Sequence, residues 1–241
     1  MTMTIYAIGD IHGQLSMLQE ALGWIEADGG PDAQVVFLGD YVDRGPDSAG
    51  VLELISGGIN AGRNWTAVKG NHDRMFEWFL EDGPRHDPHL KVTHNWLHKD
   101  LGGRATLSSY GIEVTDEHRL SEVHAHAKEA VPAAHKAFLR NLPCFYQTEG
   151  YLFVHAGIRP KVALADQEEN DLVWIREPFL SFQEDHPWLV VHGHTALKAP
   201  QHYGNRVNLD SGAGYGRPIS VGVFEGDDVY WLQNGTRVAA N

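Results

Sequence analysis

The chain has 241 residues, enough to build one large hydrophobic core, and its hydrophobic share of 42% is ordinary for a globular protein. Its formal net charge of −13 disfavours broad nucleic-acid or anionic-membrane binding, which needs a basic face. The single cysteine, Cys144, excludes an internal disulfide framework, and no signal peptide or membrane-spanning apolar run is evident. We therefore expect one cytoplasmic domain over residues 1–241.

Strand and helix patterns alternate along the first third of the chain. Short apolar runs followed by glycine or a charged turn predict buried strands, and apolar residues at a spacing of three and four predict amphipathic helices. The strands are predicted at 5–8, 35–38 and 65–68, and the helices at 15–25 and about 47–55. This β-α-β-α-β order is typical of a sheet covered by helices.

Residues 75–143 have a different character. A helix is predicted from Met75 to Leu80, a polar and histidine-rich exposed loop at 84–94, and a helical pattern at 120–142 that contains Pro132. We interpret this region as a mostly helical insertion, a candidate lid or substrate rim, within the same domain.

Strands dominate from Phe145 onward. They are predicted at 152–154, 188–191, 206–209, 219–224 and 229–232, with the last two joined as a hairpin over Gly226-Asp227. A second sheet packed on the first is the expected result, which gives an α/β (α+β) fold.

Five glycine-containing clusters of polar residues lie at the ends of predicted strands. They are Gly9–Gly13, Gly39–Gly45, Gly70–Asp73, His155–Gly157 and Gly193–Thr195. Open α/β sheets bind ligands at the carboxyl ends of their strands, and carboxylate, imidazole and amide groups are metal ligands. The five clusters together predict a two-metal site assembled from strand ends.

The candidate ligands can be divided between two ions. They are Asp10 and His12 for one ion, Asp40 as a bridge, and Asn71, His155 and His194 for the other. A bridging carboxylate can hold two cations at the ~3.5–4 Å separation of two-metal hydrolases. Alone, a strand-end aspartate is more often a turn former, but that explanation does not require six ligand-type residues in such loops. Mixed nitrogen and oxygen ligation suits Mn²⁺, Fe or Zn²⁺.

These motifs resemble the phosphoprotein phosphatase branch of the calcineurin-like metallophosphoesterases. Its signatures Gly-Asp-x-His-Gly and Gly-Asp-x-Val-Asp-Arg-Gly match in full, and Gly-Asn-His-Glu departs only at Asp73. The resemblance extends from Ile5 to about Phe224. It implies a central β-sandwich flanked by helices, the ligand division given above with Asp40 shared, and two divalent ions, Mn²⁺ foremost.

The resemblance and the charges together suggest a mechanism. A water bridging two cations loses a proton near neutral pH and can attack phosphorus in line. His72 would protonate the leaving oxygen, and Asp43 would orient His72 and favour its protonated form. Arg44 would bind the phosphoryl oxygens through its planar fork. Arg176 resembles a second phosphate-binding arginine of the family, whereas we expect Arg159 to form a surface salt bridge.

Other motifs carry less information. We interpret His192 as structural or as a support for neighbouring ligands. Tyr215, in the glycine-rich run 212–216, resembles a tyrosine of a loop near the family's site. That run precedes a strand, which argues against a dinucleotide-binding turn, and no Gly-x-Ser-x-Gly elbow is present.

Two substrate hypotheses follow. The first is a protein phosphatase acting on phosphoserine or phosphothreonine, favoured by Asp43 and Arg44. The second is symmetrical hydrolysis of diadenosine tetraphosphate by the same fold, kept open by Asp73 and by 103–111, a segment that resembles both groups. A metal-binding regulator without catalysis is disfavoured because no ligand or proton donor is missing, and a nuclease because the chain is acidic.

Overall fold

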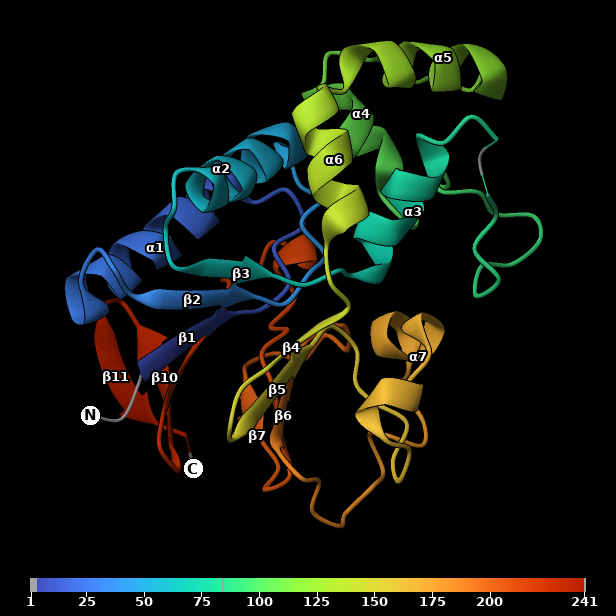
Figure 1. Ribbon diagram of the computed structural model, residues 1–241. Coiled ribbons are helices and arrows are strands. Elements are labelled where there is room, and N and C mark those ends of the chain that lie inside the picture. The colour runs from blue at the N-terminus through green and yellow to red at the C-terminus, as the bar shows by residue number, and fades with distance from the viewer. Residues whose placement is uncertain (1–3, 84, 241) are drawn as a thin grey trace.

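The fold consists of two packed β-sheets with helices on their outer faces (Figure 1). The computed structural model describes residues 4–83 and 85–240. Helices α1 and α2 cover one sheet, and α7 lies beside the other (Figure 1). Helices α3 to α6 gather at one end of the molecule (Figure 1). The predicted α/β sandwich flanked by helices is therefore confirmed.

The first sheet has six strands among the described residues, in the order β11-β10-β9-β1-β2-β3. Strands β1, β2 and β3 are parallel, and β9 runs antiparallel to β1. The bounds are β1 Thr4–Ile8, β2 Gln34–Phe37, β3 Trp65–Ala67, β9 Val221–Glu225, β10 Asp228–Gln233 and β11 Thr236–Ala239. Because β1 to β3 are parallel, the loops that follow them leave at the same edge of the sheet.

The second sheet has five strands in the described part of the chain, in the order β4-β5-β6-β8-β7. Strands β5, β6 and β8 are parallel to one another, with antiparallel β4 and β7 at the edges. The bounds are β4 Phe145–Gln147, β5 Tyr151–Val154, β6 Leu189–His192, β7 Gln201–His202 and β8 Arg206–Asn208.

The central strands are apolar on both faces because both faces are covered. In β1, Ile5 and Ala7 pack between the sheets, whereas Tyr6 and Ile8 pack against the helices. Alternate residues of β5 divide in the same way between the sandwich interior and α7. This two-sided burial explains why these strands appear in the sequence as continuous apolar runs and lack a period of two.

Helices occupy the connections between the strands. Their bounds are α1 Leu15–Gly29, α2 Ser48–Asn60, α3 Asn71–Phe79, α4 Gly103–Ser109, α5 Leu120–Ala130, α6 Ala133–Asn141, η1 Leu164–Asp166, α7 Glu169–Trp174 and η2 Ala213–Tyr215. Pro132 separates α5 from α6, since proline cannot donate the hydrogen bond that a continuous helix needs. In the described ranges, no helix combines the length and the apolar character that crossing a bilayer requires.

The sequence patterns missed the short elements α4, α7, β4, β7 and β11 and the one-turn helices η1 and η2, which have too few residues for a clear period. Residues 85–102 contain no helix or strand, in agreement with the predicted loop, and Pro84 lies outside the described residues. The loop is less exposed than expected, because Asp87 is buried and forms an ion pair with Arg74 of α3.

Candidate dimetal active site

The loops after β1 and β2 are joined at the edge of the first sheet. The backbone N–H groups of Ile11 and His12 donate to the carbonyl oxygen of Asp40 at 3.1 and 2.7 Å. This contact places Asp10 and His12 against Asp40, as expected for neighbouring parallel strands. The loops after β5 and β6 are joined similarly, with Gly193 N–H donating to His155 O at 2.8 Å.

Many of the candidate site residues have an unfavourable backbone conformation. In the described residues, positive φ at non-glycine positions occurs at His12, Asp40, Asp43, Arg44, Lys161, His194 and Asn234. Five of these seven are candidate ligands or catalytic groups. Left-handed backbone is uncommon outside glycine, and strain of this kind gathers at functional sites where the surrounding structure enforces it.

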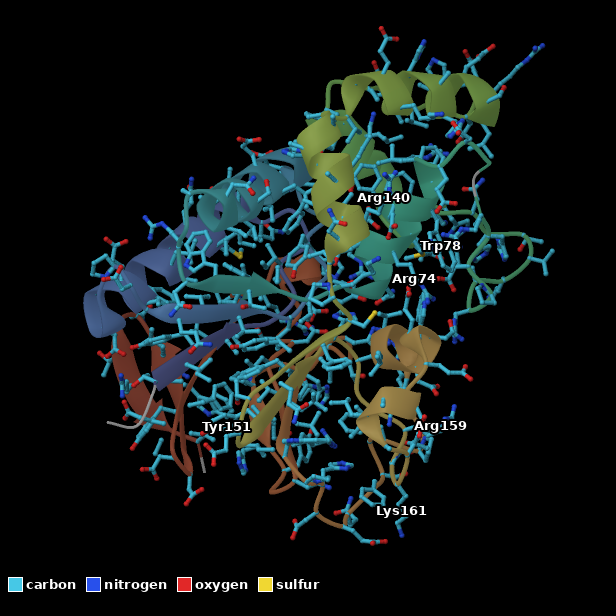
Figure 2. All side chains as sticks on the ribbon, viewed as in Figure 1. Arg74, Trp78, Arg140, Tyr151, Arg159 and Lys161 are labelled. Atoms are coloured by element: carbon cyan, nitrogen blue, oxygen red, sulfur yellow. The ribbon has the colours of Figure 1, made fainter. Side chains whose placement is uncertain are left out.

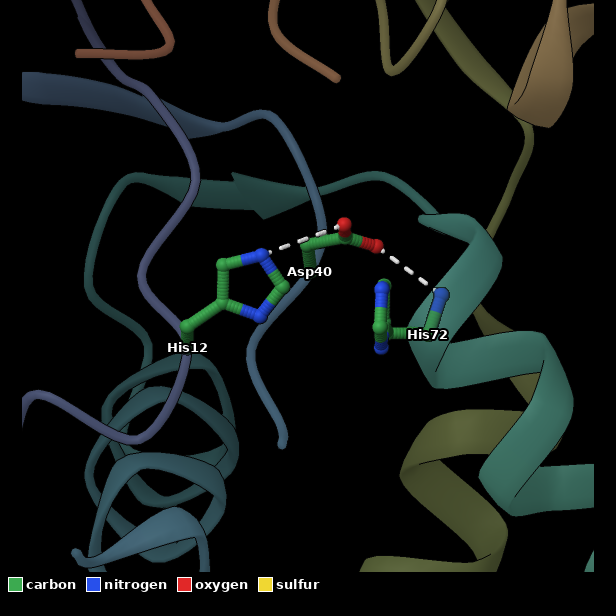
Figure 3. Close-up of side chains that lie close together, drawn as sticks. All are labelled: His12, Asp40 and His72. Carbon is green, nitrogen blue, oxygen red and sulfur yellow. Dashed lines mark hydrogen bonds and ion pairs between the residues drawn. The ribbon is translucent and has the colours of Figure 1, made fainter. Parts of the chain in front are cut away.

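Asp40 lies at the centre of the site. Its carboxylate is 3.5 Å from His12 Nε2 and accepts the backbone N–H of His72 at 2.9 Å (Figure 3). It also lies 3.4 Å from His155 Nε2. The ligand atoms of His12, Asp40 and His72 form one compact group, and those of Asp40, His155 and His194 form another. Asp40 is thus common to two potential cation sites.

The carboxylate of Asp73 fixes the Asp40 loop to the start of α3. It accepts the backbone N–H groups of Asp40 at 2.7 Å, Tyr41 at 2.9 Å and Gly70 at 2.9 Å. A Cβ on Gly70 would lie 2.3 Å from the Asp40 nitrogen, so only glycine allows this approach. Burial, with a further contribution from Asp40, raises the pKa of Asp73 to about 8.

Two histidines present a lone pair to the interior of the site. His12 Nδ1 donates to Val42 O and His155 Nδ1 donates to Leu38 O, both at 2.8 Å. These bonds place the proton on Nδ1, which leaves Nε2 as an acceptor and is the usual support of a metal-binding imidazole. Burial lowers the pKa of both histidines, which keeps them in the neutral form that binds cations.

The side-chain oxygen of Asn71 lies close to ring nitrogens of two histidines. Its Oδ1 lies 2.9 Å from His155 Nε2 and 3.0 Å from His194 Nδ1, while His194 Nε2 is buried and has no hydrogen-bond partner among the described residues. An amide oxygen opposite an imidazole lone pair is favourable only with a proton or a cation between them. This donor set fits a divalent cation of borderline softness.

Asp10 completes the acidic interior. Its carboxylate lies 4.0 Å from His12 Nε2 and accepts the backbone N–H of His194 at 3.1 Å. Burial, followed by the nearby carboxylates Asp210 and Asp40, raises the pKa of Asp10 well above its ordinary range. A cation among these carboxylates would offset that repulsion and favour their ionised form.

His72 and Asp43 form the pair that the sequence suggested. His72 Nδ1 donates to Asp43 Oδ2 at 2.6 Å, and Asp43 is completely buried. His72 Nε2 lies at the cavity and is 3.0 Å from Arg44 Nη2. The second terminal nitrogen of the Arg44 guanidinium, Nη1, contacts His12 Nε2. The imidazole of His72 is also a possible metal ligand, because its ring nitrogen belongs to the group formed with His12 and Asp40.

The two predicted phosphate-binding arginines line one cavity. Arg44 and Arg176 border a hollow of about 100 Å³ together with Asp10, His72 and Asp210. Arg159 is turned away from it and lies at the outer side of the η1–α7 region (Figure 2), where Nε and Nη2 bind Asp171 at 2.8 Å each. The predicted surface salt bridge of Arg159 is therefore present.

His192 and Tyr215 also lie near the site. His192 is buried and contacts Gly193 O and Arg206, and burial together with Arg206 lowers its pKa to about 3. It stays neutral and supports the loop that carries His194. The Tyr215 ring lies 5.3 Å from the Arg44 guanidinium carbon and borders the cavity, with 66% of the residue exposed.

A family comparison agrees with this geometry. The profile of the calcineurin-like phosphoesterases matches residues 3–219. The chain belongs to this family. It is accordingly a hydrolase of the dimetal phosphoesterase class, as the motifs predicted.

Relatives of this phosphoesterase include enzymes with two different names. Serine/threonine-protein phosphatase 1 of Salmonella typhimurium is 28% identical, covering 90% of each chain. The asymmetrical bis(5'-nucleosyl)-tetraphosphatase PrpE of Bacillus subtilis is 27% identical, covering 88% of this chain and 87% of its own. A crystal structure of a candidate diadenosine tetraphosphatase covers the whole chain and 95% of its own, with a TM-score of 0.67 and 22% identity. The crystal structure of a cold-active protein-tyrosine phosphatase from a Shewanella species has a TM-score of 0.66 and 16% sequence identity, covering the whole of this chain and 81% of its own. The two crystal structures support the fold alone.

Several cavity residues were missed by sequence reasoning. Asp210 borders the cavity and lies two residues after the end of β8, just as Asp10 lies two residues after the end of β1, so it carried the same strand-end signal. Leu101 and Trp174 also line the cavity, but they come from a loop and from a short helix without a recognisable motif. Leu101, Trp174 and Tyr215 together form the rim of the cavity.

Proposed function

We propose that this phosphoesterase is a serine/threonine protein phosphatase. The size of the cavity is the main support. At about 100 Å³ it is far below the roughly 300–1,000 Å³ of sites that enclose whole small molecules. It has room for a phosphoryl group and the atoms beside it, so the rest of the substrate would lie outside, as a phosphorylated protein does.

The proposed cofactors are two divalent ions, with Mn²⁺ as our proposal and Fe or Zn²⁺ as alternatives. One ion would be held by Asp10, His12 and Asp40. The other would be held by Asp40, Asn71, His155 and His194. When bound, the ions would polarise the phosphoryl oxygens and acidify water at the site, which is what two-metal hydrolases gain from them.

The remaining roles belong to side chains of this chain. Arg44 and Arg176 would bind the phosphoryl oxygens from the cavity wall, where guanidinium forks match phosphate geometry. His72 would deliver the proton at Nε2 to the leaving oxygen as the phosphorus–oxygen bond breaks, and would regain a proton from water. Asp43 would hold the imidazole through Nδ1 and stabilise its protonated form.

Side-by-side kinetics test the proposal. Metal-stripped enzyme would be restored with Mn²⁺, Fe²⁺ or Zn²⁺, and kcat/KM compared for a phosphothreonine peptide and for diadenosine tetraphosphate. We expect the peptide to be preferred by tenfold or more, with Mn²⁺ giving the highest rate. A preference for the dinucleotide with every metal would refute the protein-phosphatase proposal. Enzyme kept free of metal serves as the control.

The second candidate is a dinucleoside tetraphosphate hydrolase. The aromatic rim residues Trp174 and Tyr215 support it, because a nucleobase outside the cavity could stack on an aromatic ring. The PrpE relatives support it as well. Product analysis separates its two forms: symmetrical cleavage of diadenosine tetraphosphate gives only ADP, and asymmetrical cleavage gives ATP and AMP. ATP and AMP would contradict the symmetrical reaction that the sequence suggested.

A further inference from the structure

The carboxylate of Asp43 is held by two side chains from the insertion. Trp96 Nε1 donates to Oδ2 at 2.9 Å, the same oxygen that accepts from His72 Nδ1. Thr106 Oγ1 donates to Oδ1 at 2.7 Å. Asp43, Trp96 and Thr106 are all buried, so these bonds are shielded from competition with water.

Thr106 also fixes the backbone of Asp43. The N–H of Asp43 donates to Thr106 Oγ1 at 2.8 Å, so one hydroxyl accepts from the Asp43 main chain and donates to its side chain. Asp43 has a φ of 74°, a conformation that an aspartate seldom adopts without such support. The two bonds to Thr106 therefore restrict both the backbone of Asp43 and the direction of its carboxylate.

Trp96 links Asp43 to the helix that carries His72. Its ring stacks on Phe76 at 5.0 Å between centroids and contacts Phe79 at 4.8 Å, both on α3. His72 lies in the first turn of the same helix. One indole thus packs against the helix of the imidazole and donates to the carboxylate, which fixes the two members of the pair relative to each other.

Two glycines allow the insertion to approach this closely. A Cβ on Gly103 would lie 2.6 Å from the Trp96 ring, and a Cβ on Gly102 would lie 2.4 Å from Arg44 N. Gly102 has a φ of 92° and its carbonyl accepts the Arg44 N–H at 3.3 Å. The segment 96–106 therefore contacts the backbone of Arg44 as well as the side chain of Asp43.

We propose that Trp96 and Thr106 are positioning residues for proton transfer by His72: they hold the Asp43 carboxylate in the direction that aims the imidazole at the leaving oxygen. This rests on the proposed acid role of His72. The insertion then contributes to the chemical step itself, in addition to any covering of the substrate.

Leaving-group dependence tests the proposal. A general acid matters when the leaving oxygen is basic, as in phenyl phosphate, and matters little for 2,4-dinitrophenyl phosphate, whose leaving group departs unprotonated. General acids contribute about 10²–10⁴-fold, and we expect loss of orientation to remove a part of this. Thr106→Val and Trp96→Phe should each lower kcat for phenyl phosphate by about tenfold or more. For the dinitrophenyl ester, the decrease in kcat should stay below about twofold. Thr106→Ser keeps the hydroxyl that Thr106→Val removes, so its kcat for both esters should match that of the wild type.

Matched controls separate positioning from general destabilisation. Trp188→Phe and Thr66→Val change a partly buried tryptophan and a partly buried threonine remote from Asp43, and should leave the ratio of the two rates unchanged. An equal loss for both esters in Thr106→Val and Trp96→Phe would refute positioning, because a damaged fold affects both. If Thr106→Val does not fold, the same ratio is taken from Trp96→Phe, which keeps a ring on Phe76.

The variant His72→Asn distinguishes failure of this inference from failure of the proposed mechanism. If His72→Asn lowers kcat much more for phenyl phosphate than for the dinitrophenyl ester, while the Trp96 and Thr106 variants lower both equally, only the positioning proposal is wrong. If His72→Asn lowers both rates equally, His72 is not the acid, and both the acid assignment and the positioning proposal are overturned.

Discussion

Asp87 should contribute more to stability than any exposed ion pair of this chain. Its Oδ2 accepts from Arg74 Nη2 at 2.8 Å and from Trp174 Nε1 at 3.1 Å, and its Oδ1 accepts the His89 N–H at 3.0 Å. Asp87 and Arg74 are each 2% exposed. Arg74 lies on α3 where that helix approaches α7 (Figure 2), and its Nη2 also donates to Asn170 at 3.1 Å.

The substitution Asp87→Asn removes the buried counter-ion of Arg74 and leaves only Glu169, a largely exposed carboxylate whose Oε1 lies 3.7 Å from Arg74 Nη1. Breaking a buried ion pair from one side costs about 3–5 kcal/mol, a large part of the roughly 5–15 kcal/mol by which domains are stable. The exposed pair Arg159–Asp171 provides the control, and Asp171→Asn should cost less than about 1 kcal/mol. Urea unfolding at pH 7 would measure both values, provided that the m-values agree.

The pH dependence of the free energy of unfolding follows from the same contacts. Burial opposes ionisation of Asp87, but the His89 N–H and Arg74 outweigh it and lower its pKa. A group with a lowered folded pKa stabilises fully above its unfolded pKa of about 4, and this contribution is lost as the pH falls below that value. The difference in stability between wild type and Asp87→Asn should decrease as the pH falls below about 4. A cost of less than about 1 kcal/mol, equal to the Asp171→Asn control, would refute the buried-pair reasoning.

Three further predictions concern the site. Asp40→Asn should reduce bound metal below two ions per chain by mass spectrometry and lower kcat by about 100-fold or more, and unchanged stoichiometry would contradict a bridging role. Tyr215→Ala should raise KM for diadenosine tetraphosphate about tenfold, as expected for a lost stacking contact, with Tyr203→Ala as the exposed control; equal KM values would exclude stacking on Tyr215. Because the net charge is −13, raising ionic strength from 10 to 150 mM should increase kcat/KM for anionic substrates, and a decrease would indicate attraction outside the cavity.

The arrangement of the candidate ligands could be predicted because it depends on strand direction. Asp10 and Asp40 follow adjacent parallel strands, and His155 and His194 lie at the ends of two others. Each sheet contains three neighbouring parallel strands, β1-β2-β3 in the first and β5-β6-β8 in the second, so the residues that follow these strands lie at one edge of the packed sheets. A short apolar run followed by glycine and a ligand-type residue therefore carries long-range information in local sequence.

The supports of the site could not be predicted in the same way. Asp87 lies in a polar, histidine-rich stretch that indicated an exposed loop, and its burial depends on Arg74, thirteen residues earlier. Trp96 has no periodic neighbours, and its partner Asp43 is 53 residues away. Such contacts arise when tertiary packing brings an irregular segment against a helix, and nothing in the local composition of the loop encodes the partner.

Beyond the size of the cavity, which leaves no room for a whole dinucleotide, substrate choice should depend on the rim. Both candidate substrates would present the same phosphoryl chemistry to Arg44 and Arg176, and a hollow of about 100 Å³ has room for little more than that group. We expect the part of the substrate that lies outside to contact the rim residues Leu101, Trp174 and Tyr215. Changes at the rim should consequently alter KM differently for peptide and dinucleotide, whereas changes at the metal ligands should lower kcat for both. A ligand variant that reversed the substrate preference would show that discrimination occurs inside the cavity.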